Sequence, residues 1–304
     1  GMCGSMGAAF STISNNHIYD IWTKRQFRGA ETGAIKLHAP IDVLIEKNHL
    51  HNAGRGLWMD WMTQGTHITG NLCYDNTIHD LFLEVNHGPY LVDNNICLSE
   101  TALESWSEGG AYVHNLFVGY IRNRPSSRPT PFHKPHSTEL AGLKNIVNGD
   151  ERFYNNIFVA REAEIPVNSN PNDRKKTGYG LDIYQNTELP MFVDGNVYLN
   201  GAKAFPGEKN IIILEKENPG VKLLQKENGL FLNLEMPNLS GLETTLVTTE
   251  LLGKAAIPDA AYENADGSPL SIDTDFFGAT RNKDNPTAGP FEAITSGQQL
   301  LKLW

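Results

Sequence analysis

The chain has 304 residues, of which 40% are apolar, and a formal net charge of −10 at pH 7. This composition predicts a folded core, and the acidic balance argues against nucleic acid or an anionic membrane as a partner. No run of 18 apolar residues predicts a membrane span, and the start GMCGSMGAAF lacks the basic region and apolar stretch of a signal peptide.

From Ser11 onwards, an asparagine followed by alternating apolar residues recurs along the chain. The repeats begin at Asn16, Asn48, Asn71, Asn95, Asn115, Asn156 and Asn196, with gaps of 32, 23, 24, 20, 41 and 40 residues. The short gaps suit one coil of a parallel β-helix, and the long gaps suit either a coil with an insertion or two coils of which one is degenerate. Leucine-rich repeats and β-propellers have different frames. The chain is therefore predicted to be all-β, a single-stranded parallel β-helix whose asparagines stack at one bend.

Two short apolar segments, GLWMDWM and LFLEVNHG, carry one acid each, Asp60 and Glu84. In a strand, Met59 and Trp61 would face the core, and Trp58 and Asp60 would face outwards. The offset of 24 residues (84 − 60) maps apolar positions onto apolar positions and the acid onto the acid. The two acids are therefore expected to be neighbours on adjacent coils, about 4.8 Å apart.

The same offset extends this column to Lys36 upstream and to Glu108 downstream. A spacing of one strand fits the pair of carboxyl groups of a retaining glycosidase, which lie ~5–5.5 Å apart. Lys36 would favour the ionised form of Asp60 and make it a nucleophile. Acids on both sides would favour the protonated form of Glu84 and make it a general acid.

Side chains around the acids are expected to bind a sugar substrate. Trp58 offers an aromatic face to a pyranose ring, and polar groups for hydroxyls are His38, Gln64, Asn86, His87, His133 and His136. His133 and His136 lack a third ligand at short spacing, so neither a metal nor a cofactor is expected. Cys73 and Cys97, again 24 residues apart, are expected to stack as buried thiols in preference to a disulfide.

The rest of the chain divides into two parts. Residues 1–200 are predicted to form the β-helix, with a long loop leaving it at residues 120–138, which are rich in Pro, Ser and Arg. Residues 201–304 are predicted to form the last coils and a C-terminal cap. No amphipathic helix precedes the first coil, so either a second subunit covers this end in a homo-oligomer or upstream coils are missing.

The segments GLWMDWMTQGT, DLFLEVNHGPYLVDNNI, SEGGAYVHNLF and TPFHKPHST resemble glycoside hydrolase family 120, a β-xylosidase family, and the similarity continues through TTELLGKAAIP, YENADGSPL and DTDFFGATRN. The resemblance implies a right-handed β-helix and a retaining mechanism on an oligosaccharide, with Asp60 as nucleophile and Glu84 as acid/base. It also implies Glu31 as a third acid of the pocket. Family members are longer, with upstream coils and an inserted β-sandwich domain that this chain would lack.

Two other functions remain open from the sequence. A polysaccharide lyase on the same fold would need a Lys or Arg base and a site for anionic sugars, which the acidic column does not favour. A non-catalytic module for glycan binding or assembly would suit a chain without an upstream half.

Overall fold

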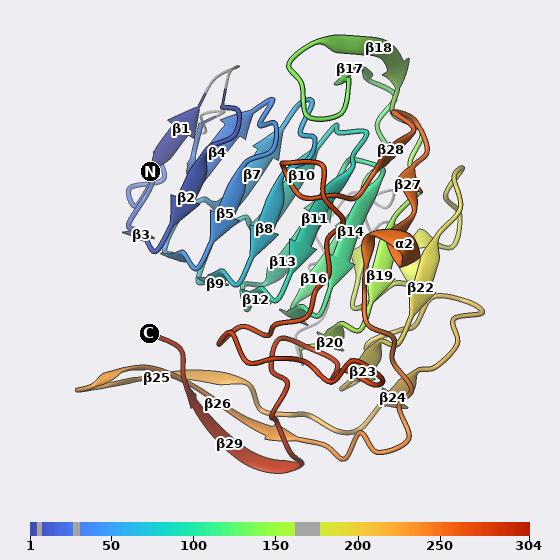
Figure 1. Cartoon of the computed structure of the whole chain (residues 1–304). Coiled ribbons are helices and arrows are strands. Elements are labelled where there is room, and N and C mark those ends of the chain that lie inside the picture. Colours follow the sequence, from blue (N-terminus) through green and yellow to red (C-terminus); the bar gives the residue numbers. More distant parts are fainter. Residues whose placement is uncertain (5–7, 27–30, 162–176) are drawn as a thin grey trace.

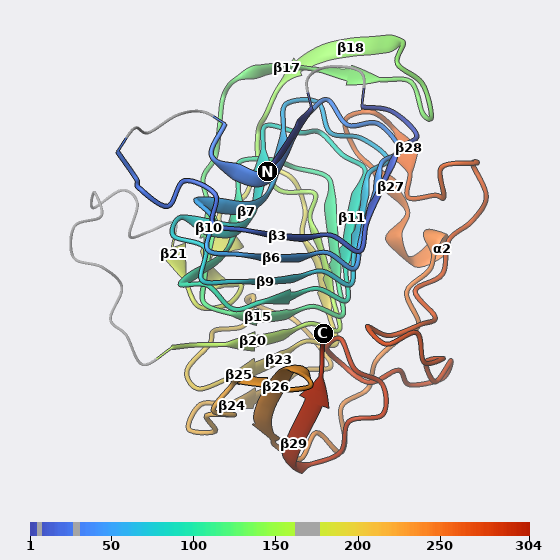
Figure 2. The same ribbon diagram turned by 90° about the vertical axis from the view of Figure 1, so that its left-hand side faces the viewer.

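The computed structural model describes residues 1–4, 8–26, 31–161 and 177–304 and shows a parallel β-helix (Figure 1). Each coil adds one strand to each of three sheets, and almost all neighbouring strands in these sheets pair in parallel. Figure 2 shows the strands of the third sheet stacked as successive rungs. The predicted fold class is confirmed. Across the described ranges, no helix is long and apolar enough to cross a membrane.

The three sheets share one pattern, in which each strand pairs with its counterparts on the coils before and after. The first sheet contains, in order, β1 (Met2–Gly4), β4 (Gly33–His38), β7 (Arg55–Asp60), β10 (His79–Glu84), β13 (Thr101–Ser105), β16 (Tyr120–Asn123) and the antiparallel β21 (Thr177–Gly178). The second contains β2 (Thr12–Ser14), β5 (Leu44–Glu46), β8 (His67–Thr69), β11 (Tyr90–Asp93), β14 (Gly110–Val113), β19 (Arg152–Tyr154) and β22 (Phe192–Asp194). The third contains β3 (His17–Tyr19), β6 (His49–His51), β9 (Leu72–Tyr74), β12 (Ile96–Cys97), β15 (Leu116–Val118), β20 (Ile157–Val159), β23 (Val197–Leu199) and β24 (Ile212–Leu214).

The predicted asparagine ladder runs through the coil without a break. From Asn16 to Asn196, each side-chain amide donates to the side-chain oxygen of the next asparagine over 2.9 to 3.1 Å. The last amide donates to Glu208 over 2.6 Å. Consecutive asparagines lie on consecutive coils even across the two long gaps in the sequence, so each long gap is one coil with an insertion.

One insertion forms an antiparallel hairpin of β17 (Pro129–His133) and β18 (Leu140–Asn145), which projects from the coil at the top of Figure 1. The segment 120–138, predicted to be a loop, therefore begins as β16 of the first sheet and includes β17. A hairpin satisfies its backbone hydrogen bonds internally, which a long loop cannot do.

The core follows the predicted alternation up to the end of β7. Leu57 and Met59 are buried inside the coil, and Cys73 and Cys97 stack in register there as free, buried thiols, as predicted. The prediction that Trp61 faces the core is wrong. The strand ends at Asp60, and Trp61 takes a positive φ of 35°, which turns its side chain outwards. The guanidinium carbon of Arg128 lies 5.0 Å from the centroid of the Trp61 ring.

The C-terminal part contributes β24 to the last coil and then runs back along the outside of the molecule. Its antiparallel sheet contains β25 (Lys222–Lys226), β26 (Gly229–Met236) and β29 (Gly297–Lys302), and its shorter elements are α2 (Thr249–Leu252), β27 (Lys254–Ala255) and β28 (Ala260–Ala261). A single 3₁₀ turn, η1 (Asp182–Tyr184), lies within the coil part of the described chain. Leu232 and Leu234 of β26 pack with the outward-facing Leu116 and Val197 of the third sheet. This segment therefore covers a side of the coil as well as its end.

Candidate active site

Asp60 and Glu84 are register partners at the ends of β7 and β10. In-register residues of adjacent parallel strands lie about 4.8 Å apart and point to the same face. The inward neighbours Met59 and Leu83 are also register partners, so both acids point out of the first sheet. The central pair predicted from the sequence is therefore side by side on adjacent coils.

The prediction that Lys36 and Glu108 continue the column of Asp60 and Glu84 is wrong. Asp60 pairs with His38, and Lys36 pairs with Trp58, because the step from β4 to β7 is shorter than the step from β7 to β10. The step from β10 to β13 is shorter in the same way, which leaves Glu108 outside the strand. The predicted offset holds between β7 and β10 alone among these steps, because the bends of the neighbouring coils are shorter.

Lys36 nevertheless reaches Asp60 along the diagonal. Its Nζ lies 3.1 Å from Oδ2 of Asp60 and donates to Oε1 of Glu31 over 2.8 Å, and Lys36 is 1% exposed. His38 Nδ1 lies 3.2 Å from the same Asp60 oxygen. A buried lysine and an imidazole thus converge on the same carboxylate oxygen of Asp60.

Glu31 sits at the rim of this cluster, with about half of its side chain exposed. Burial alone would raise its pKa, but hydrogen bonds from Lys36 and from the Cys3 thiol outweigh burial and lower the pKa. A largely ionised, accessible carboxylate in this position can accept hydrogen bonds from sugar hydroxyls.

The pKa of Glu84 is raised by its surroundings. Burial and the nearby charge of Asp60 raise the pKa of Glu84, while a hydrogen bond from Trp58 and the charge of Lys36 oppose this rise. The indole Nε1 of Trp58 donates to Oε2 of Glu84 over 2.8 Å. Glu84 therefore keeps its proton to a higher pH than an ordinary glutamate, as a general acid must.

Trp58 supports the acids in a different way from the one expected. It is 5% exposed, with the Lys36 ammonium 3.7 Å and the Arg55 guanidinium 4.3 Å from its ring centroids. Cations cover its face, so its main contact in the site is the hydrogen bond that orients Glu84.

Four of the other predicted substrate contacts instead fasten the hairpin of β17 and β18. Gln64 exchanges two hydrogen bonds with the backbone of His133, at 2.9 and 3.0 Å, and both residues are buried. His87 is 2.5 Å from Glu108 through Nδ1, and its Nε2 donates to the carbonyl of Thr130. Glu108 is fully buried and accepts backbone hydrogen bonds at the base of the hairpin.

Asn86 and His136 also have structural contacts. Asn86 is fully buried and bonds to the Met59 carbonyl and to the hydroxyl of Ser107. His136 bridges Asp42 and Glu263, at 3.0 and 3.4 Å, and so joins the hairpin loop to the C-terminal segment. The structure thus gathers Glu31, Lys36, His38 and Trp58 around the acids and places the remaining predicted residues in the supporting framework.

A further carboxylate on the outer face of the first sheet, Glu104, is missing from the sequence interpretation. Its neighbours are His79 Nε2 at 2.8 Å, the indole of Trp106 at 2.7 Å, and the guanidinium groups of Arg122 and Arg124 at 3.6 Å. Burial alone would raise its pKa, but these partners lower it to about 2. Glu104 is the register partner of Phe82 and not of Glu84, so a column drawn through the two acids at a fixed offset of 24 residues does not reach it.

Comparisons with protein-family models and with curated proteins found no match. Among solved structures, the chain is similar to one described as "The complex structure of XylC with xylose". The sequences are 38% identical, the TM-score is 0.90, and the match covers 99% of this chain. The chain spans about half of the XylC chain, 49% of its length.

Proposed function

We propose that this protein is a retaining glycoside hydrolase that removes β-linked xylose, or a related pyranose, from oligosaccharides. The observation that carries the proposal is the register pair of Asp60 and Glu84, one next to a buried lysine and the other with a raised pKa. Paired carboxyl groups at about this spacing are those of retaining enzymes. The similarity to XylC, whose structure holds xylose, supports the choice of sugar.

In the proposed first step, a carboxylate oxygen of Asp60 attacks the anomeric carbon while the Glu84 proton passes to the glycosidic oxygen. The bond from that carbon to the leaving sugar breaks, and a glycosyl ester forms on Asp60. In the second step the Glu84 carboxylate takes a proton from water, the water oxygen attacks the same carbon, and Asp60 is released. The β configuration is inverted twice and therefore retained.

The neighbouring residues have distinct roles in this scheme. Lys36 and His38 both contact Asp60 and fix the orientation of its carboxylate. Trp58 orients Glu84, and Glu31 would accept hydrogen bonds from hydroxyl groups of the bound sugar. The lyase alternative is less well supported, because the nearest lysine is engaged by two carboxylates and is not available as a base.

The test is a panel of aryl β-xyloside, glucoside, galactoside and arabinoside, with the first-formed product anomer followed by NMR. We expect the xyloside to react fastest and to release the β anomer. Asp60→Asn and Glu84→Gln should each reduce turnover by about 10³-fold or more. With azide, Asp60→Asn should form the α-glycosyl azide, because azide would attack from the side that Asp60 vacates.

Glu46→Gln is the matched control, since it changes a carboxylate to an amide on the second sheet, away from the site. Its turnover should equal that of the unmodified protein, and thermal unfolding should show that all three variants are folded. Release of the α anomer, or near-normal turnover in either site variant, would show the proposal to be wrong. Xylose binding with no hydrolysis of any glycoside would select the non-catalytic binding module.

A further inference from the structure

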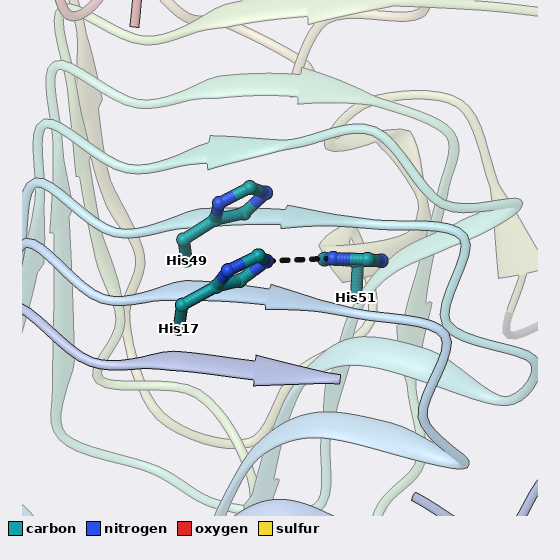
Figure 3. A group of neighbouring side chains, drawn as sticks. All are labelled: His17, His49 and His51. Carbon is teal, nitrogen blue, oxygen red and sulfur yellow. Dashed lines mark hydrogen bonds between the residues drawn. The ribbon is translucent and has the colours of Figure 1, made fainter. Parts of the chain in front are cut away.

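Three histidines gather on the outer face of the third sheet (Figure 3). His17 lies on β3, and His49 and His51 lie on β6. One ring nitrogen of each lies within 4.8 Å of the others, and the Nε2 atoms of His17 and His51 are 2.9 Å apart. The sequence interpretation considered metal binding at His133 and His136 and did not identify this cluster.

Strand register explains why the three imidazoles meet. His17 is the register partner of His49, and His51 stands two positions further along β6 on the same face. The rings of His17 and His49 stack 4.2 Å apart at an angle of 7°. His51 is sandwiched between Tyr19 and Tyr74, at 5.3 and 4.8 Å and nearly parallel to both. The rings are therefore ordered before any ligand arrives.

The buried member of the cluster has an unsatisfied polar atom. His49 is 4% exposed, its Nε2 lies 2.9 Å from the Tyr74 hydroxyl, and its Nδ1 has no hydrogen-bond partner among the described residues. A buried polar atom without a partner destabilises the folded state, and a bound ligand would remove this cost. An imidazole nitrogen without a hydrogen-bond partner among the described residues is available to bind a metal ion.

We propose that His17, His49 and His51 form a binding site for a divalent transition metal, with Zn²⁺ as the ion that fits best. Three neutral imidazoles are a common ligand set for Zn²⁺, with a fourth position open to water. Zn–N bonds of about 2.0–2.1 Å at a tetrahedral angle require nitrogens about 3.3–3.4 Å apart. The separation of 2.9 Å between His17 and His51 is below this value and all the separations lie within 4.8 Å, so modest ring rotations would form the site.

The position of the cluster suggests what a bound ion would do. It would link β3 of the first described coil to β6 of the next, beside Trp304, whose ring centroid is 5.0 Å from that of His49. The ion would thus link two neighbouring coils at one end of the β-helix. This inference is independent of hydrolysis, because the cluster lies on the third sheet and the acids on the first.

The test is titration of the full chain, without added histidines, with Zn²⁺ in a calorimeter and with Co²⁺ in a spectrophotometer. His17→Phe and His51→Phe keep a flat ring in the stack and remove its nitrogens. Each should weaken Zn²⁺ binding by at least about tenfold and abolish the visible absorbance of tetrahedral Co²⁺. His67→Gln, outside the cluster, should leave both signals unchanged.

A second readout is thermal unfolding, in which Zn²⁺ should raise the midpoint of the unmodified protein and EDTA should reverse the rise. The absence of Zn²⁺ binding at millimolar concentration would overturn the proposal. So would unchanged affinity in His17→Phe and His51→Phe, since the ion would then bind elsewhere. Should His51→Phe fail to fold, His17→Phe decides alone, because His17 is exposed.

Discussion

The indole nitrogen of Trp58 donates to Glu84 across the boundary between two coils, at 2.8 Å. The donor lies on β7 with Asp60, and the acceptor lies on β10. One coil of the helix therefore supplies both the proposed nucleophile and the group that orients the proposed acid. Parallel stacking makes this arrangement possible, because every outward side chain has a register neighbour on the next coil.

Trp58→Phe should move the alkaline limb of the pH–activity profile to higher pH. The hydrogen bond from Trp58 favours the charged form of Glu84, so its loss should raise the pKa of Glu84 further. The measurement is kcat/KM for an aryl β-xyloside from acid to mildly alkaline pH. Trp106→Phe is the matched control, because its indole donates to Glu104, and the profile should not move. A profile identical in both variants would contradict the role of Trp58.

Lys36→Met should destabilise the protein more than Asp60→Asn. Lys36 is buried against two carboxylates, Asp60 and Glu31, and its removal leaves the buried Asp60 charge without its cation, which costs about 3 kcal/mol. Asp60→Asn leaves Lys36 paired with Glu31 and should cost about 1 kcal/mol. Urea unfolding of both variants and of the double variant gives the coupling energy. Strictly additive effects would show that the two residues do not interact.

Replacing an asparagine of the ladder should lower the free energy of unfolding most in the middle of the ladder. Asn95 is fully buried, donates to Asn115 and to two carbonyls, and accepts from Asn71. Asn95→Ala leaves several buried groups unpaired and should lower the free energy of unfolding by about 3 kcal/mol or more. Asn16→Ala, at the part-buried end of the ladder, should cost about 1 kcal/mol. Equal losses at both positions would argue against burial as the cause.

The contacts of His136 with Asp42 and Glu263, which attach the loop between β17 and β18, should weaken as pH rises. Burial works against the charged form of His136, but hydrogen bonds and charges from Asp42 and Glu263 raise its pKa. Burial also raises the pKa of Asp42. Groups with a raised pKa stabilise the folded state fully below their unfolded pKa, about 6.5 for histidine, and lose this effect as pH passes the folded pKa.

The measurement is urea unfolding of the unmodified protein and of His136→Gln at a series of pH values. The stability difference between them should be largest near about pH 6 and should shrink towards about pH 8. His133→Gln is the contrasting control, because burial lowers the pKa of His133. The stability difference between the unmodified protein and His133→Gln should therefore grow with pH over the same range. If the differences for His136→Gln and His133→Gln changed with pH in the same direction, the role assigned to His136 would be wrong.

The coil and its central pair follow from the order of the amino acids alone. Asparagines at coil spacing can satisfy one another only by stacking, and an acid at the same place in two matching apolar segments must point to the same face. The ladder from Asn16 to Asn196 and the pairing of Asp60 with Glu84 were therefore predictable, as were the stacked thiols of Cys73 and Cys97.

Which residues surround that pair, and which support the framework, depends instead on how distant segments pack. Coil lengths vary, so the shorter step on either side of the pair replaced Lys36 with His38 in the column and moved Glu108 out of it. Gln64 and His87 looked like sugar contacts in the sequence, yet the hairpin folds over them and takes their hydrogen bonds. Spacing along a chain records periodicity, whereas burial depends on which distant segment packs against each side chain.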